Sequence, residues 1–80
     1  MPWFLYLLEC ADGTFYAGIS NRLEQRLETH NRGAGAKYTR GRLPVSLIAF
    51  KEFPDRSSAS KAEFELKKRP RADKKDYFKL

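Results

Sequence analysis

The sequence predicts an α+β fold, in which a small three-stranded antiparallel sheet is flanked by helices in the order β-β-α-β-α-α. Two short apolar runs stand on either side of the turn signal Ala11-Asp12-Gly13, and a third run stands before Pro54. Segments with helical periodicity follow the second and third runs. With 80 residues and no internal repeat, the chain is expected to form one domain over residues 1–80.

The first two strands form a hairpin, and its loop length decides which side chains share a face. The strands are expected at Trp3–Cys10 and Thr14–Ile19. A two-residue turn would place Tyr6 and Tyr16 on opposite faces of the sheet, whereas a three-residue loop places both on one face. We favour the three-residue loop, because Gly13 at its third position suits a type I turn closed by a G1 bulge.

The second strand contains Ala17 and Gly18, which are poor strand residues because they offer little side chain to pack. One explanation is a bulge with no further role. The other is that something must come close to the backbone at Gly18, beside the phenol of Tyr16.

The first helix is expected to begin at Asn21, since Asn21 followed by Glu24 is a variant of the capping box, and to end at Gly33. Residues 33–44, with the sequence GAGAKYTRGRLP, are expected to form a long loop of small and basic residues. The later elements are a third strand over Val45–Phe53, a second helix capped by Asp55 or Ser57 that runs to about Arg69, and a short helix over Arg71–Phe78 after Pro70.

The charge balance points to a polyanionic partner. The chain has 16 basic and 10 acidic residues, a formal charge of +6. Nucleic acid is the first candidate and an anionic membrane the second, although a basic surface with no partner gives the same balance. No basic amphipathic helix with bulky aromatics is evident, which argues against a membrane. Cys10 is the single cysteine and the apolar start is too short for a signal peptide or a span, so we expect a cytoplasmic protein.

Three ionisable side chains fall on helix faces that should be apolar. At about 100° per residue, Arg26 and His30 lie on the same stripe as Leu23 and Leu27, and Glu63 lies within the apolar stripe of the second helix. Burying such groups without partners costs several kcal/mol each. They either form a buried Arg–Glu network or line a cleft where a charged ligand completes the set. For His30 alone, a core histidine with satisfied hydrogen bonds is the simpler alternative.

These residues resemble the signature of the GIY-YIG nucleases. YAG at 16–18 is similar to the YIG half, and FLY at 4–6 stands where GIY belongs, with Tyr6 and Tyr16 ten residues apart as in that family. Arg26 matches the family's helix arginine, His30 stands where the family has histidine or tyrosine, and Glu63 matches its metal-binding glutamate. The resemblance spans nearly the whole chain and is closest to the small stand-alone bacterial members.

The sequence departs from the family pattern at two places. Phe4 and Leu5 replace the Gly-Ile of the first triplet, of which only the tyrosine has a chemical part. Ile19 stands where some relatives carry a lysine. The positive charge that this lysine supplies in those relatives must come from another residue here, or it is missing.

The resemblance implies a metal-dependent endonuclease that hydrolyses phosphodiester bonds in DNA. One Mg²⁺ or Mn²⁺ would bind Glu63, and Arg26 would stabilise negative charge in the transition state. Tyr16 is the first choice for positioning and deprotonating the attacking water, with Tyr6 beside it. Ala17 and Gly18 are then expected to keep the strand surface low beside Tyr16, so that a phosphodiester can approach its phenol. His30 relays the proton, acts as the base itself, or only orients Tyr16. No small-molecule cofactor is expected, and the protein is expected to be a monomer or weak dimer.

Further residues are candidates for nucleic-acid contact. In the long loop, Tyr38 stands between basic residues; its ring is suited to base stacking and the cations are suited to phosphate contact. The alternative is that these residues form a solvated basic loop with no ligand. Cations at the end of the second helix extend this footprint or serve only as helix-end charges. The predicted contacts are Gly18, Lys37, Tyr38, Arg40, Arg42 and Lys67, with Lys68, Arg69 and Arg71 as possible extensions. The competing functions are a nucleic-acid-binding module with a weak or inactive nuclease site, and an adaptor for an acidic protein.

Overall fold

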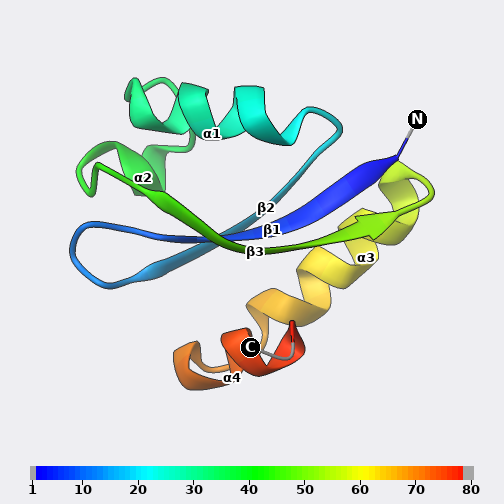
Figure 1. Ribbon diagram of the computed structural model, residues 1–80. Helices are drawn as coiled ribbons and strands as arrows, with labels where there is room; N and C mark the ends of the chain where they lie inside the picture. Colours follow the sequence, from blue (N-terminus) through cyan, green and yellow to red (C-terminus); the bar gives the residue numbers. More distant parts are fainter. Residues whose placement is uncertain (1, 79–80) are drawn as a thin grey trace.

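The computed structural model describes residues 2–78, in which a three-stranded sheet lies between two layers of helices (Figure 1). The predicted α+β fold and element order are confirmed, with one short helix, α2, added in the segment expected to be a loop. The elements are β1 (Trp3–Glu9), β2 (Phe15–Ser20), α1 (Leu23–Asn31), α2 (Lys37–Arg40), β3 (Ser46–Phe53), α3 (Arg56–Lys67) and α4 (Arg71–Tyr77). Among the helices within residues 2–78, none is long and apolar enough to cross a membrane.

The sheet has the order β2-β1-β3 with antiparallel neighbours, so β1 is the central strand. The three-residue hairpin loop is confirmed. Cys10 N donates to Thr14 O at 2.8 Å, and Gly13 has a φ of 82°. In the resulting register Tyr6 pairs with Gly18 and Leu8 with Tyr16, so both phenols lie on the same face of the sheet.

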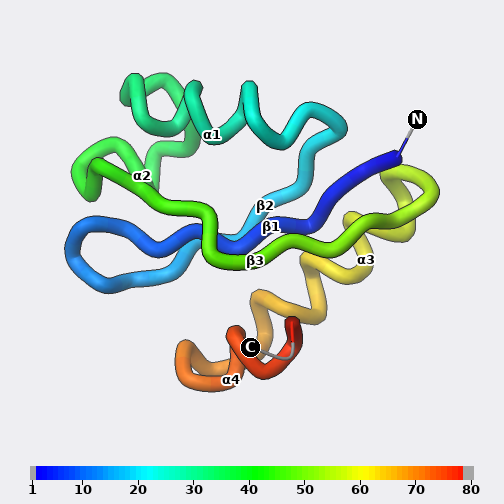
Figure 2. Tube along the Cα trace, in the orientation of Figure 1, coloured from blue at the N-terminus to red at the C-terminus, as the bar shows by residue number. Residues whose placement is uncertain are grey.

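Alternation along β1 and β2 builds a separate core on each face. Leu5, Leu7 and Ala17 pack with Leu66 on the side covered by α3 and α4. Tyr6 and its neighbours on the opposite face pack beneath α1 and the segment that contains α2, as the path of the chain shows in Figure 2. A small domain with two thin cores has little apolar surface to spare, so a polar residue placed in either core must have its hydrogen bonds satisfied.

The helix ends agree only in part with the sequence prediction. The predicted capping box at Asn21 and Glu24 is wrong: α1 begins after Arg22, which makes no side-chain cap. Ser20 Oγ instead accepts a hydrogen bond from Arg22 N at 2.9 Å. The predicted cap at Asp55 is confirmed, because its carboxylate accepts a hydrogen bond from Ser58 N at 2.8 Å.

The segment between α1 and β3 is held against the sheet by two polar side chains. Asn31 pairs with the backbone of Val45 in both directions: its Nδ2 donates to Val45 O at 3.1 Å, and its Oδ1 accepts from Val45 N at 2.7 Å. Within α2, the side chain of Thr39 is wholly buried. Gly33 follows α1 with a φ of 78°, as expected for the glycine that ends this helix.

Candidate active site

Two tyrosines and a histidine from three different elements meet on the α1 face of the sheet. Tyr6 comes from β1, Tyr16 from β2 and His30 from the last turn of α1. The hydroxyl of Tyr6 lies 3.1 Å from His30 Nε2, and the ring of Tyr16 packs edge-on to the imidazole with centroids 5.4 Å apart. His30 has no exposed surface, as its place on the apolar stripe of α1 predicted.

A chain of hydrogen bonds fixes the protonation of His30. Thr39 Oγ1 donates its single proton to the carbonyl oxygen of Ala36 at 2.9 Å, so it must accept the hydrogen bond that joins it to His30 Nδ1, also 2.9 Å long. In its neutral form, His30 therefore carries its proton on Nδ1. Nε2 is then the acceptor, and it receives a hydrogen bond from the hydroxyl of Tyr6. The hydroxyl oxygen of Tyr6 can still accept a hydrogen bond.

Both ring nitrogens of His30 are thus occupied by Tyr6 and Thr39. No nitrogen is left for a direct relay from Tyr16, which was one of the expected roles for this histidine. The remaining contact between His30 and Tyr16 is packing of ring against ring. This arrangement favours the third expected role, in which His30 holds the orientation of Tyr16.

Two glycines make room for this cluster. A Cβ at Gly18 would lie 2.6 Å from Cζ of Tyr6, and one at Gly35 would lie 2.8 Å from Cγ of His30. The space above Gly18 is therefore filled by the phenol of Tyr6. This differs from the expectation that Gly18 leaves room for a phosphodiester, and the cause is the cross-strand pairing of Gly18 with Tyr6.

Burial and neighbouring charges set the protonation of the cluster. Burial raises the pKa of Tyr6 above its ordinary value, and hydrogen bonding and charge from Arg26 oppose this rise. Burial also lowers the pKa of His30, and the positive charge of Arg26 lowers it further. At neutral pH Tyr6 is therefore a protonated phenol and His30 a neutral imidazole.

Arg26 borders the cluster from α1. Its guanidinium acts on both Tyr6 and His30, which places it beside the buried hydrogen-bonded chain as the stripe on α1 predicted. It also lines a hollow of about 230 Å³ formed with Ser20, Asn21, Arg22, Gln25 and Thr29. A half-buried guanidinium that opens onto a hollow is well placed to bind a phosphate group.

Glu63 approaches the cluster from α3, on the other side of the edge strand β2. Its side chain is 22% exposed, and Oε2 lies 3.2 Å from Nζ of Lys67. Lys67 Nζ in turn lies 5.6 Å from the centroid of the Tyr16 ring, so this lysine links the carboxylate to the phenol. The charge of Glu63 is also among the smaller influences that raise the pKa of Tyr6.

The donor set suits a hard divalent cation with most of its water ligands retained. Glu63 supplies one partly exposed carboxylate, and within residues 2–78 no group of three or more His, Cys, Asp or Glu side chains forms a protein cage for a metal. Mg²⁺ commonly binds through one or two carboxylates together with substrate phosphates. The residues present therefore fit this kind of site and do not fit a zinc-type site.

The predicted nucleic-acid contacts divide into free and engaged side chains. Tyr38 is 42% exposed and stacks on Tyr16 with centroids 5.8 Å apart, so the two rings form a continuous aromatic surface. Lys37 and Arg40 are exposed on α2. Arg42 is engaged, because it lies over the Tyr38 ring at 4.3 Å and forms a 2.6 Å ion pair with Asp12.

Arg71, the last of the possible extensions, has a structural role. Its guanidinium donates hydrogen bonds to the carbonyl oxygen of Gly13 and lies 4.9 Å from the ring centroid of Phe15. These contacts attach α4 to the turn of the hairpin, whereas Lys68 and Arg69 are exposed.

Sequence reasoning missed Gly35 and Thr39, which complete the pocket of His30. Both lie in the segment expected to be a loop, where no hydrophobic period points to a buried position. The available signal was chemical: a histidine predicted to be buried needs a partner for each ring nitrogen, and Thr39 is a hydroxyl residue nine positions after it.

Comparison with known proteins agrees with this arrangement. The family model of the GIY-YIG catalytic domain matches residues 2–77. A UPF0213 protein of Xanthomonas axonopodis pv. citri (strain 306) is 56% identical over 73 residues, which cover 91% of this chain and 72% of the relative. A UPF0213 protein of Streptococcus agalactiae serotype V is 46% identical over 79 residues, covering 99% of this chain and 90% of the relative.

Two solved structures share the fold. The solution NMR structure of a protein from E. faecalis has a TM-score of 0.69 and 44% identity, covering 99% of this chain and 84% of that one. The solution NMR structure of a UPF0213 protein from Bacillus halodurans has a TM-score of 0.60 and 40% identity, and the match covers 96% of this chain and 82% of that one. The chain therefore belongs to the GIY-YIG family of nuclease-type domains, with the UPF0213 proteins as its relatives.

Proposed function

We propose that this protein is a metal-dependent endonuclease that hydrolyses phosphodiester bonds in DNA. The observation that carries the proposal is the meeting of Tyr6, Tyr16 and His30 on one face, within the electrostatic reach of Arg26 and Glu63. These groups are far apart in the sequence, and three of them interrupt apolar helix faces. A domain this small has no structural need for so many polar groups in one place.

Glu63 is the residue that would hold a single Mg²⁺ or Mn²⁺, which when bound supplies positive charge to the scissile phosphate and its leaving oxygen. Arg26 then binds the non-bridging oxygens from the opposite side of the cluster. Because it is half-buried, its interaction with the developing negative charge is screened less than it would be in water.

Tyr16 is the phenol that meets the attacking water, since it is half-buried whereas Tyr6 is 2% exposed. The water oxygen bonds to phosphorus, the bond to the leaving sugar oxygen breaks, and this oxygen takes up a proton from solvent. The proton of the water passes to the hydroxyl oxygen of Tyr16 as the phenol releases its own proton to solvent. His30, fixed by Tyr6 and Thr39, keeps the Tyr16 ring in this orientation.

A matched pair of variants tests the proposal. Glu63→Gln removes the candidate ligand, while Glu65→Gln changes an exposed carboxylate on α3 that pairs with Lys68. We expect the wild type and Glu65→Gln to cut plasmid, single-stranded or branched DNA in Mg²⁺ or Mn²⁺, and Glu63→Gln to lose the activity while keeping its fold. Cutting that survives in Glu63→Gln contradicts the assignment, and cutting of RNA alone contradicts the choice of DNA.

One observation favours the alternative of a nucleic-acid-binding module with a weak site. The ion pair between Glu63 and Lys67 occupies the carboxylate that a metal needs, so the metal must compete with a tethered cation. If the wild type binds DNA in a salt-sensitive manner and cuts none of the substrates, this second function holds. We also infer a cytoplasmic location, which suits a nucleic-acid substrate and the single buried thiol of Cys10.

A further inference from the structure

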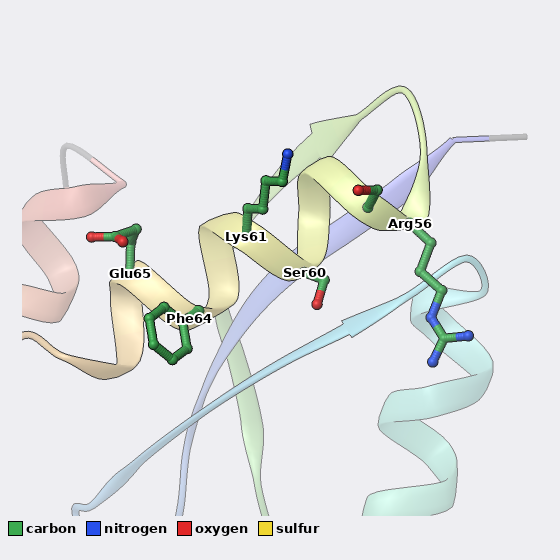
Figure 3. Close-up of a pocket in the computed structure, with 6 residues that line it drawn as sticks. Arg56, Ser60, Lys61, Phe64 and Glu65 are labelled. Atoms are coloured by element: carbon green, nitrogen blue, oxygen red, sulfur yellow. The ribbon is translucent and has the colours of Figure 1, made fainter.

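A wide hollow lies along α3, outside the tyrosine–histidine cluster. It has a volume of about 880 Å³ and opens widely to solvent (Figure 3). Its lining combines cations, hydroxyls and one aromatic ring: Arg56, Ser57, Ser60, Lys61, Phe64 and Glu65. Neither the core nor the candidate active site uses this surface.

Phe64 is the most exposed large apolar side chain that the structure describes, at 62%. Lys68 Nζ lies 4.3 Å from its ring centroid, which repeats the arrangement of Arg42 over Tyr38 at 4.3 Å. Phe50, which is 55% exposed, packs edge-on against another phenylalanine instead. Lys68 lies over one face of the Phe64 ring, which leaves the other face for an unpaired base to stack on.

A free cation on the same side of the helix suits a phosphate backbone. Arg56 takes part in none of the ion pairs formed among residues 2–78, so its charge is available to a ligand. Arg56 makes a cation–π contact, because its guanidinium lies 5.6 Å from the ring centroid of Trp3. The hydroxyls of Ser57 and Ser60 add neutral donors to the same hollow.

This surface is continuous with the candidate active site. At about 100° per residue, Arg56, Ser60 and Lys67 fall within about 40° of one another on α3, with Glu63 on one flank and Phe64 on the other. Figure 3 shows Ser60 and Phe64 on the same side of the helix and Lys61 on the opposite side. From residue 56 to residue 64 the helix rises by about 12 Å, which matches a few stacked nucleotides at about 3.4 Å each.

We propose that this face of α3 binds an unpaired segment of a nucleic-acid strand, with a base stacked on Phe64 and a phosphate bound by Arg56. It rests on the proposed function only in the choice of ligand, because it concerns binding and needs no cleavage. A paired duplex does not offer free base faces to the Phe64 ring, so the proposal selects single-stranded over double-stranded ligand.

The test measures binding without metal, in EDTA, so that cleavage does not interfere. A fluorescent oligothymidine of roughly 12 nucleotides and a duplex of the same length are titrated with wild type, Phe64→Ala and Phe50→Ala, with fluorescence anisotropy as the readout. We expect Phe64→Ala to bind the oligothymidine roughly 5- to 100-fold more weakly and the duplex with nearly unchanged affinity. Phe50→Ala removes a ring of similar exposure elsewhere and should bind both like the wild type.

The outcomes separate this inference from the proposed function. Equal oligothymidine affinity of Phe64→Ala and Phe50→Ala overturns the inference even if the enzyme cuts DNA. An equal loss for the duplex, or no binding of oligothymidine by the wild type at low salt, overturns it as well. Arg56→Gln provides a second variant with little effect on the core, and it should weaken oligothymidine binding and reduce its dependence on salt. An unchanged salt dependence contradicts the role of Arg56.

Discussion

The hydrogen-bonded chain behind the candidate active site makes a sharp prediction for Thr39→Val. Valine preserves the shape of threonine but removes the hydroxyl that accepts from His30 Nδ1 and donates to Ala36. Because Thr39 and His30 are both wholly buried, no water replaces the lost partner without a rearrangement. The substitution therefore leaves a buried donor without an acceptor.

The magnitude follows from the cost of such an unsatisfied group, about 1–3 kcal/mol. A domain of 80 residues has an unfolding free energy of about 4–12 kcal/mol, so this loss is a large part of the total. With an m-value near 1 kcal/mol/M, at the low end for small proteins, the urea midpoint should fall by roughly 1–3 M. Thr39→Ser keeps the hydroxyl and loses only one methyl group, which costs about 1 kcal/mol.

Stability alone does not separate the two variants sharply, so the decisive assay is the ¹⁵N NMR spectrum of the imidazole. In the wild type and in Thr39→Ser we expect His30 to carry its proton on Nδ1 at neutral pH, with Nε2 as the acceptor. In Thr39→Val the preference for this tautomer should be lost. A wild-type spectrum with the proton on Nε2, or a Thr39→Val variant that matches the wild type in both tautomer and stability, refutes the reasoning.

Two further predictions concern the same cluster. Gly18→Ala should destabilise the fold by about 1–3 kcal/mol, because the added Cβ meets the Tyr6 ring. Gly41→Ala is the control and should change stability little, since a Cβ there meets nothing within 4 Å. Equal urea midpoints for the two variants would show that the Tyr6 ring moves freely. The lowered pKa of His30 predicts that stability is full above the ordinary histidine pKa of 6.5 and decreases as pH falls below it, because the unfolded chain takes up a proton that the folded chain resists. Urea midpoints measured at pH 7.5 and 5.5 should differ in the wild type and not in His30→Gln, and an equal decrease in both contradicts the assignment of this effect to His30.

The sequence was sufficient where a local rule had a single geometric consequence. The three-residue loop that ends at Gly13 fixed the hairpin register, and this register placed Tyr6 and Tyr16 on one face. Helical periodicity likewise placed Arg26 and His30 toward the sheet. Both arguments depend only on the number of residues between two positions, which is the same in the sequence and in the folded chain.

Other features depend on contacts between segments, which no local rule supplies. Asparagine is a good capping residue, but Asn21 does not cap α1. The backbone N–H of Arg22, just before the helix, donates to the hydroxyl of Ser20 instead. Thr39 and Gly35 became visible only once the segment after α1 was folded over His30. Their roles follow from the three-dimensional need of one buried imidazole, and no periodicity in the sequence encodes that need.

The glycine at position 18 shows how a weak strand residue and the tyrosine–histidine cluster are connected. With a side chain at that position, the Tyr6 ring could not lie flat across β2, and its hydroxyl would not reach His30. The lost strand propensity, roughly within the 1 kcal/mol span of the scale, is the smaller effect. The larger effect is that a buried phenol and a buried imidazole satisfy each other, which leaves Tyr16 as the more exposed phenol of the pair. If the proposed function holds, Gly18 acts on it through the position of Tyr6 and without contact with the phosphate.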